Sequence, residues 1–322
     1  MNFIVSIISI VLTFFLVFPF LTVLLSLFRK EKIKQKGEYK EFDFGVIITA
    51  YKNAGITKGN VKALLKQNYT KFHIYNVLDD CDITDWDIVH EKLTIFSPRP
   101  PLKLKVKSII HAVEHFVRPH DYVIVMDADN LADPDFLKII NEYANAGHRS
   151  IQGQRTAKNV DTGYAGADAI GEFYKNYIER YVTYLIGSSA VISGSGMAVE
   201  SELYKGYLYS PEIEKGKHLW KKMLQEDKIL QNYLLRKNEK IAWAKNAIVF
   251  DEKVSSGEAV QTQRSRWLYS YFQNLPNSGG LLWRGIKNFS WNQLIFGLVT
   301  IAPPLFYSGF FDNDFHCYRL FC

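Results

Sequence analysis

The chain has 322 residues, enough for one large domain or two modest ones, and its 48% hydrophobic content excludes wholesale disorder. Its cysteines, Cys81, Cys317 and Cys322, form neither a disulfide framework nor a metal-ligand spacing, which favours a reducing compartment. The net charge of +6 is modest, and we expect no nucleic-acid partner.

An uncharged apolar segment opens the chain. It runs from Phe3 to Phe28, long enough for a transmembrane helix and too long for the apolar core of a secretory signal. The following stretch is rich in lysine, which orients the amino terminus outward and the next domain into the cytoplasm. We therefore expect a transmembrane helix over 1–29 in the cell membrane. Residues 30–43 would be a basic juxtamembrane linker against anionic membrane lipids. A buried core helix is the alternative.

Apolar strands and amphipathic helices alternate after this linker. The predicted strands are 44–50, 73–78 and 122–126, and the predicted helices are 60–67, 107–117 and 133–143. Such alternation predicts βαβ units, a parallel sheet and a three-layer α/β fold.

Acidic residues end two of the predicted strands and should meet at one edge of the sheet. Asp127 and Asp129 are hard oxygen ligands suited to Mg²⁺ or Mn²⁺ together with substrate phosphates. Asp79 and Asp80 could accept hydrogen bonds from ribose hydroxyls or a base imide. Each pair could also be an ordinary turn.

Basic residues at 103, 105 and 107 precede or start a helix, where lysine and the helix dipole suit a diphosphate. At least one of them could instead lie on the exposed face of a short strand. Further along, the segment 194–197 carries two glycines, which allow either close approach to a ligand or a tight turn.

The predicted helix 107–117 contains His111, Glu114 and His115, which match the H-x-x-E-H zinc pattern. A polar helix face that meets solvent explains these residues more simply, and we favour it over a zinc site.

Two further motifs follow. Glu226 and Asp227 begin a predicted helix, where they could complement the helix dipole or supply a general base in a water-poor site. Gln263, Arg266 and Trp267 combine phosphate-binding and sugar-stacking groups. A surface helix whose Trp267 packs on the core is the alternative.

The carboxyl-terminal region again suggests membrane contact. Residues 271–290 mix aromatic, apolar and basic side chains, as interfacial amphipathic segments do. Residues 291–311 form a second apolar membrane segment, interrupted by Pro303 and Pro304. The tail, 312–322, has no clear pattern.

The order of the acidic pairs and the Gln263–Trp267 pentapeptide resembles the D, DxD, ED, QxxRW series of membrane-bound family 2 glycosyltransferases. These include cellulose, chitin and hyaluronan synthases. The segment Val46–Tyr51 is similar to the first strand of that family, and the resemblance spans Phe44 to Trp267. It implies a GT-A domain over 44–270, a Rossmann-like nucleotide-diphospho-sugar transferase fold.

The resemblance also implies roles for individual residues. The nucleotide would be bound by Tyr51, Asp80 and Asp127. Asp79 could assist Asp80, and either Lys105 or Lys107 would supply the lysine. Asp129, helped by Asp127, would hold Mg²⁺ or Mn²⁺ on the diphosphate. Asp227 would deprotonate the acceptor hydroxyl. The acceptor channel and the diphosphate would be contacted by Glu226, Gln263, Arg266 and Trp267.

The activity implied is inverting transfer of a glucose- or N-acetylglucosamine-type sugar from a UDP-sugar to a glycan or lipid-linked acceptor at the cytoplasmic membrane face. Polymer-secreting members have several carboxyl-terminal spans, and at most one is visible here. A membrane protein partner could therefore complete a translocation path. The alternatives are a single-addition lipid glycosyltransferase and an inactive nucleotide-sugar-binding subunit of an envelope complex.

Overall fold

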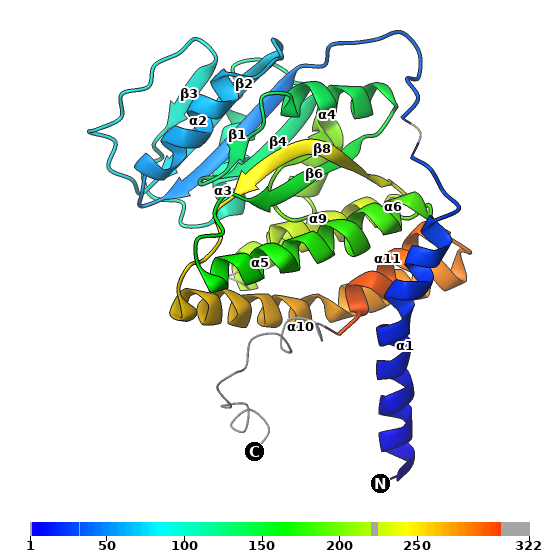
Figure 1. The fold of residues 1–322 in the computed structure, drawn as a ribbon. Coiled ribbons are helices and arrows are strands. Elements are labelled where there is room, and N and C mark those ends of the chain that lie inside the picture. The colour runs from blue at the N-terminus through cyan, green and yellow to red at the C-terminus, as the bar shows by residue number, and fades with distance from the viewer. Residues whose placement is uncertain (1, 32, 220–224, 304–322) are drawn as a thin grey trace.

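A mixed β-sheet forms the centre of the molecule. The computed structural model describes residues 2–31, 33–219 and 225–303, in which eight strands follow the order β3-β2-β1-β4-β7-β6-β8-β5 (Figure 1). Their bounds are β1 Phe44–Tyr51, β2 Phe72–Asp79, β3 Leu93–Phe96, β4 Tyr122–Asp127, β5 Leu131–Ala132, β6 Ser150–Ala157, β7 Met197–Glu200 and β8 Ile241–Asp251.

The prediction of a parallel sheet is correct for one half only. Strands β3, β2, β1 and β4 are parallel, and β6 pairs in parallel with β8. Strand β7 runs antiparallel to both of its neighbours, and β5 runs antiparallel to β8. A buried strand has the same apolar pattern in either direction, so its direction depends on the path of the chain between strands.

Helices cover both faces of the sheet, as predicted for a three-layer fold (Figure 1). Val46 and Ile48 of β1 pack against one layer, which contains α2 (Lys58–Leu65) and α4 (Phe136–Asn145). Ile47 faces the opposite layer. That second layer contains α3 Lys105–Glu114, α7 Ser201–Leu208 and α9 Glu226–Arg236. The alternation of side chains along β1 thus divides the core in two.

A long helical stretch separates β6 from β7. It comprises α5 (Gly163–Tyr174), a π-helix at Lys175–Val182 and the short α6 (Thr183–Leu185). A π-helix adds a residue per turn and turns side chains away from their α-helical positions, and such segments are frequent at functional sites. Two further short elements are η1 (Gly55–Thr57) and α8 (Pro211–Leu219).

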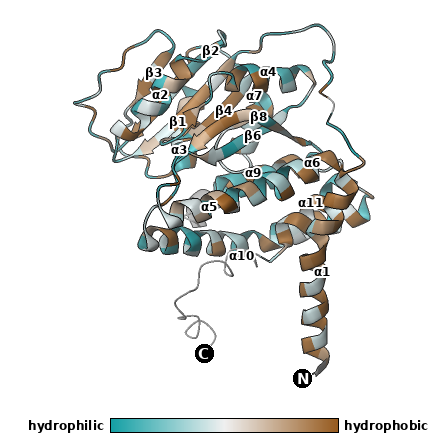
Figure 2. Cartoon of the chain, in the orientation of Figure 1, coloured by the Kyte–Doolittle hydropathy of each residue, from teal (hydrophilic) through white to brown (hydrophobic). Residues whose placement is uncertain are grey.

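The first helix, α1 (Asn2–Ser26), extends away from the domain, and its surface is apolar along its length (Figure 2). Its segment Phe3–Ser26 has a mean hydropathy of 2.7 and is only 6% buried, so length and composition suit a membrane span. The following linker packs along α4. Asn145 accepts from the Lys40 N–H at 2.7 Å and donates to the Lys40 carbonyl at 2.8 Å, so this part of the linker is fixed to the domain.

Helix α10 (Gly257–Lys287) is continuous across the expected boundary between the GT-A domain and the interfacial segment. Helix α11 (Trp291–Ile301) folds back against it, and both lie crosswise to α1 (Figure 1). The backbones of the two helices lie very close together at Gly285 and Gly297. A Cβ on either residue would lie within 2.7 Å of the facing backbone, so only glycine allows this approach. The 11 residues of α11 rise roughly 16 Å, about half of a bilayer core. Residues 304–311 of the expected second membrane segment, and the 312–322 tail, lie outside the described residues.

Candidate active site

The Asp127–Asp129 turn, which carries two carboxylates, is held by a buried asparagine. The Asn130 amide donates to Asp251 at 3.0 Å and to Asp129 at 3.3 Å. Its oxygen accepts from the Asp127 N–H at 3.1 Å and from the hydroxyl of Ser195. Every hydrogen-bonding group of this amide is therefore engaged in fixing the turn. Our sequence interpretation did not identify Asn130, although it directly follows the Asp-x-Asp pattern.

The turn lies in a strongly negative environment. Burial raises the pKa of the Asp129 carboxyl to about 6, and the charges of Asp251 and Asp127 add to that effect. Asp251 ends β8 and pairs with the partly buried guanidinium of Arg155. The apolar run of β8 also ends in an aspartate, so the same strand-end pattern could have identified Asp251.

Lys105 joins three parts of the site. Its Nζ lies 2.7 Å from an Asp127 oxygen, 3.3 Å from a Glu226 oxygen and 3.1 Å from the Gly194 carbonyl. Burial lowers the pKa of Lys105, but Asp127 and Glu226 outweigh it and raise the pKa, so the ammonium stays charged. Lys107 is exposed two residues along the helix. The structure therefore brings Lys105, rather than Lys107, to the acidic residues.

Glu226 and Asp227 begin α9, as predicted, but their environments differ. Burial raises the pKa of Glu226, opposed by the ammonium of Lys105. The Asp227 side chain is 23% exposed and accepts from the Lys228 N–H at 2.8 Å. Gly194 adopts φ +77°, and a Cβ there would lie 3.5 Å from the Asp227 Cβ. The glycine turn thus combines left-handed backbone with close approach to Asp227.

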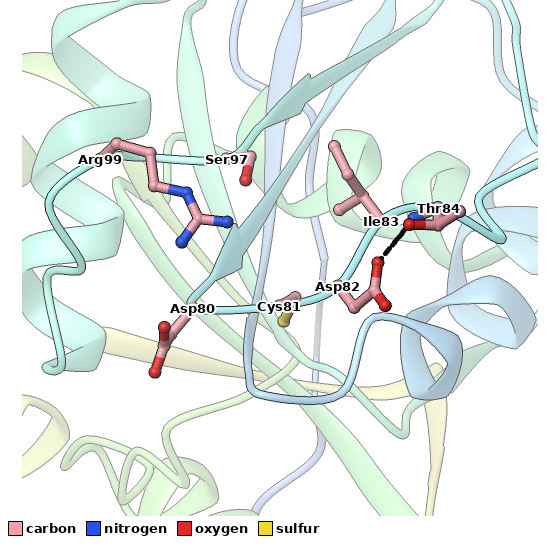
Figure 3. A pocket seen from close by; sticks show the side chains of 7 residues that line it. All are labelled: Asp80, Cys81, Asp82, Ile83, Thr84, Ser97 and Arg99. Atoms are coloured by element: carbon pink, nitrogen blue, oxygen red, sulfur yellow. Dashed lines mark hydrogen bonds between the residues drawn. The ribbon is translucent and has the colours of Figure 1, made fainter.

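Asp79 and Asp80, at the end of β2, have different environments. Asp79 is buried, and its two oxygens accept from the N–H groups of Leu102 and Lys103 at 2.7 and 2.6 Å. Asp80 has φ +54° and faces an open cavity of about 550 Å³ (Figure 3). Tyr51 lies opposite Asp79 in the sheet register and is half-exposed.

The pentapeptide lies in the first half of α10. Gln263 and Arg266 line a second hollow of about 420 Å³. The Lys175 ammonium, from the π-helix, lies 4.3 Å from the centre of the Trp267 ring. Burial lowers the pKa of Lys175 to about 8, partly opposed by Glu172. No sequence pattern singles out Lys175, because its contact with Trp267 joins residues far apart in the chain.

The His111–His115 segment lies at the end of α3, and the two imidazole rings are tilted against each other with centroids 4.3 Å apart. Both rings contact Phe96, and Glu114 accepts a hydrogen bond from the Tyr209 hydroxyl at 2.9 Å. These contacts support an ordinary partly solvated helix face.

The donor set at the turn fits a divalent cation that is completed by a substrate. Within residues 2–31, 33–219 and 225–303, no group of three or more His, Cys, Asp or Glu side chains could hold a metal ion by itself. Asp127 and Asp129 supply hard carboxylate oxygens, and the pKa of Asp129 is raised by burial first and by the nearby carboxylates of Asp251 and Asp127 second, so a bound cation would relieve both effects. Mg²⁺ and its relatives commonly bind to one or two carboxylates together with substrate phosphates.

The family model described as glycosyltransferase-like family 2 matches residues 42–270, which contain the acidic cluster and the pentapeptide. The chain belongs to glycosyltransferase family 2. The fold described above is therefore that of a family 2 glycosyltransferase domain, and the expectation of an α/β GT-A fold is confirmed.

A solved structure of low sequence identity has the same fold. The mannosyltransferase PcManGT from Pyrobaculum calidifontis, solved with GDP-mannose and Mn²⁺, has a TM-score of 0.64 and 13% identity. The similarity covers 92% of this chain and 84% of that one. Residues 1–349 of S. aureus TarS give a TM-score of 0.47 at 14% identity, covering 74% and 65% of the two chains. No curated protein sequence matches the chain.

Proposed function

We propose that this family 2 glycosyltransferase is a metal-dependent, inverting enzyme that transfers a sugar from UDP to a membrane-presented acceptor. The observation that carries this proposal is the convergence of Asp127, Lys105, Glu226, Gly194 and Asp227. These residues come from four separate parts of the chain, and they place a cation, paired carboxylates and a candidate base together.

Lys105 and the Asp127–Asp129 turn would hold the donor diphosphate. Lys105 is a fixed, charged donor that already lies against Asp127. Asp127 and Asp129 would hold Mg²⁺ or Mn²⁺, which when bound neutralises negative charge on the departing UDP. Asn130 binds the Asp129 carboxylate and the Asp127 backbone N–H, so the turn that carries both carboxylates does not depend on substrate to form.

Asp227 is the better candidate for the base that takes the proton from the acceptor hydroxyl. Glu226 is already paired with Lys105 at 3.3 Å, whereas the Asp227 carboxylate lies beside the glycine turn and 3.8 Å from the Lys228 ammonium. Deprotonation makes the acceptor oxygen a nucleophile at the anomeric carbon, and the bond to UDP breaks as the new bond forms. A single displacement inverts the anomeric configuration without a covalent intermediate.

The position of the membrane helix supports an acceptor at the membrane. α1 extends from the side of the domain on which α10 and α11 lie (Figure 1). The exposed apolar side chains of the carboxyl-terminal helices include Phe272, Trp283 and Ile286. A glycan or lipid-linked acceptor would approach along these helices, past Arg266 and Trp267, with the domain in the cytoplasm.

Asp227→Asn in the full chain tests this mechanism. With membranes, Mn²⁺ and a panel of UDP-sugars, we expect UDP release to fall about 10²- to 10⁴-fold because the general base is lost. Binding of UDP, measured by calorimetry, should persist. The same substitution at the exposed Asp161 is the control and should leave both values unchanged. Turnover by Asp227→Asn at the wild-type rate would refute the assignment.

A further inference from the structure

Helix α5 and the π-helix that continues it bury their polar side and expose their apolar side. The buried positions recur every fourth residue and include Asp168, Glu172, Asn176 and Arg180. On the exposed side, Ile170, Phe173 and Tyr177 have exposed fractions of 71%, 57% and 47%. A helix on the surface of a water-soluble domain has the opposite arrangement. The outward face of these two helices therefore suits an apolar environment.

Ion pairs fix the buried polar side, so the two helices cannot turn over to hide their apolar side. Arg180 pairs with Glu172 at 2.7 Å. The ammonium of Lys253, whose side chain is almost fully buried, lies 3.5 Å from Glu172 and 3.8 Å from Asp168. Rotation of α5 would take both carboxylates away from Lys253, and a buried charge that loses its partners is strongly destabilising.

The exposed face lies at the depth of the apolar part of α1. Phe18 of α1 packs with Ile186, which directly follows α6, and with Ile295 of α11. Helix α1 continues to Ser26, roughly 12 Å beyond Phe18 at the usual rise per residue. Its exposed side chains along that stretch are still apolar and include Phe20, Leu21, Leu24 and Leu25. A bilayer that covers the whole apolar segment of α1 therefore reaches past the level at which α6 and α11 join it.

The exposed face is also continuous with the other elements on the membrane side of the domain. The π-helix packs against α1. Helix α5 runs alongside α10, and both lie crosswise to α1 (Figure 1). A Cβ on Gly257, at the start of α10, would lie 3.1 Å from the Tyr164 hydroxyl, and Lys175 contacts Trp267 further along. The apolar stripe thus extends from the start of α10 toward the membrane helix.

We propose that the membrane bilayer itself covers the outward face of α5 and the π-helix. Ile170 and Phe173 then lie in lipid at the boundary between the headgroups and the acyl chains. The half-exposed Tyr164 and Tyr177, on either side of them, suit this depth, where tyrosine is enriched. The membrane-contacting surface of the domain then includes residues 163–182 as well as the carboxyl-terminal helices.

This proposal rests on the proposed function for the placement of α1 in a membrane, but it concerns lipid contact and its test does not depend on turnover. A domain seated in this way brings the contact between Lys175 and Trp267 to the membrane surface. An acceptor held in the membrane would reach this contact without leaving the lipid.

Quenching of tryptophan by brominated lipid tests the depth of this face. Phe173→Trp, made in the full chain, is reconstituted in vesicles of phosphatidylcholine and phosphatidylglycerol with either brominated or ordinary acyl chains. The measured quantity is the fluorescence that the new tryptophan adds to that of the wild type. We expect brominated lipid to reduce it about two-fold or more, because interfacial helices bury their apolar face about 5–10 Å into the acyl boundary.

Two further positions calibrate this measurement. Phe14→Trp, within α1, reports on the membrane span and should be quenched at least as strongly as Phe173→Trp. Lys138→Trp, at an exposed position of α4, should not be quenched.

A charge placed within the stripe tests the same face by a second route. Ile170→Asp, combined with Phe173→Trp, should remove most of the quenching, because a carboxylate is unfavourable among acyl chains. Ile170→Leu is the matched control and should keep the quenching. Melting curves in detergent establish that both proteins are folded.

The possible failures are distinguishable. Quenching at Phe14→Trp without quenching at Phe173→Trp would overturn the proposal and leave the membrane placement of α1 intact. That result is also expected if a second protein covers this face, because the vesicles contain no other chain. Absence of quenching at both positions would refute this proposal together with the membrane placement on which it rests.

Discussion

Replacing Asp129 by Asn should stabilise the metal-free protein while removing its response to metal. The side chain keeps its size, and its oxygen can still accept from Asn130. The substitution removes a carboxylate whose charge is opposed by burial, by Asp251 and by Asp127. Without a cation, that charge is a cost of folding, and Asn avoids it.

The magnitude follows from the pKa shift. The pKa of Asp129 rises from 3.8 to about 6, a difference worth roughly 3 kcal/mol above pH 6. Asp129 is only partly buried, so solvent screening reduces this to about 1–2 kcal/mol. For a domain of this size, each kcal/mol changes the melting temperature by about 2–4 °C. We expect a gain of about 2–8 °C at pH 8.

The pH dependence has a definite sign. A carboxyl whose folded pKa is raised is destabilising above that pKa and loses this effect as it protonates. The advantage of Asp129→Asn should therefore be full at pH 8, fall as the pH drops through 6, and be absent near pH 4.

Thermal unfolding in EDTA at pH 8, 6 and 4.5, repeated at pH 8 with MnCl₂ and UDP, measures both effects. Mn²⁺ with UDP should raise the melting temperature of the wild type and not that of the variant. Asp161→Asn, an exposed aspartate, should melt like the wild type throughout. A variant that melts below the wild type in EDTA at pH 8 would refute the electrostatic reasoning.

Two further predictions concern lysines. Lys105→Met should raise the donor KM about 10- to 100-fold, because it removes a charged hydrogen-bond donor beside Asp127. Lys107→Met is the control and should leave the donor KM unchanged. Steady-state kinetics in which only Lys107→Met raises the donor KM would contradict the assignment. Lys175→Met should raise the acceptor KM about 2- to 30-fold through loss of the contact with Trp267, with UDP affinity unchanged. Because burial lowers the pKa of Lys175 to about 8, the wild-type acceptor KM should rise between pH 7 and 9. In Lys175→Met it should stay flat, and an identical pH profile in both proteins would exclude this role.

The sequence alone placed most local features correctly. Apolar runs of strand length identified β1, β2 and β4, and aspartates at the ends of β2 and β4 identified one edge of the sheet. The acidic pair Glu226–Asp227 marked the start of α9. These features depend on a few consecutive residues, because burial periodicity and helix-terminal charge are local properties.

Other features depended on contacts between distant segments. The order of motifs could not choose between Lys105 and Lys107, because both lie within one helical turn and only the position of Asp127 decides between them. Asp79 and Asp80 are also adjacent, and the loop at 102–103 engages the first and leaves the second facing the cavity.

By itself, then, the sequence determined the strand ends, the acidic clusters, the apolar first helix and the family. Only the tertiary structure decided the direction of β7, the support of the Asp127–Asp129 turn by Asn130 and the meeting of Lys175 with Trp267. The reason is physical. Hydrophobic pattern and helix-terminal charge act over a few neighbouring residues, whereas strand direction and the partner of a buried polar group depend on where distant parts of the chain come together.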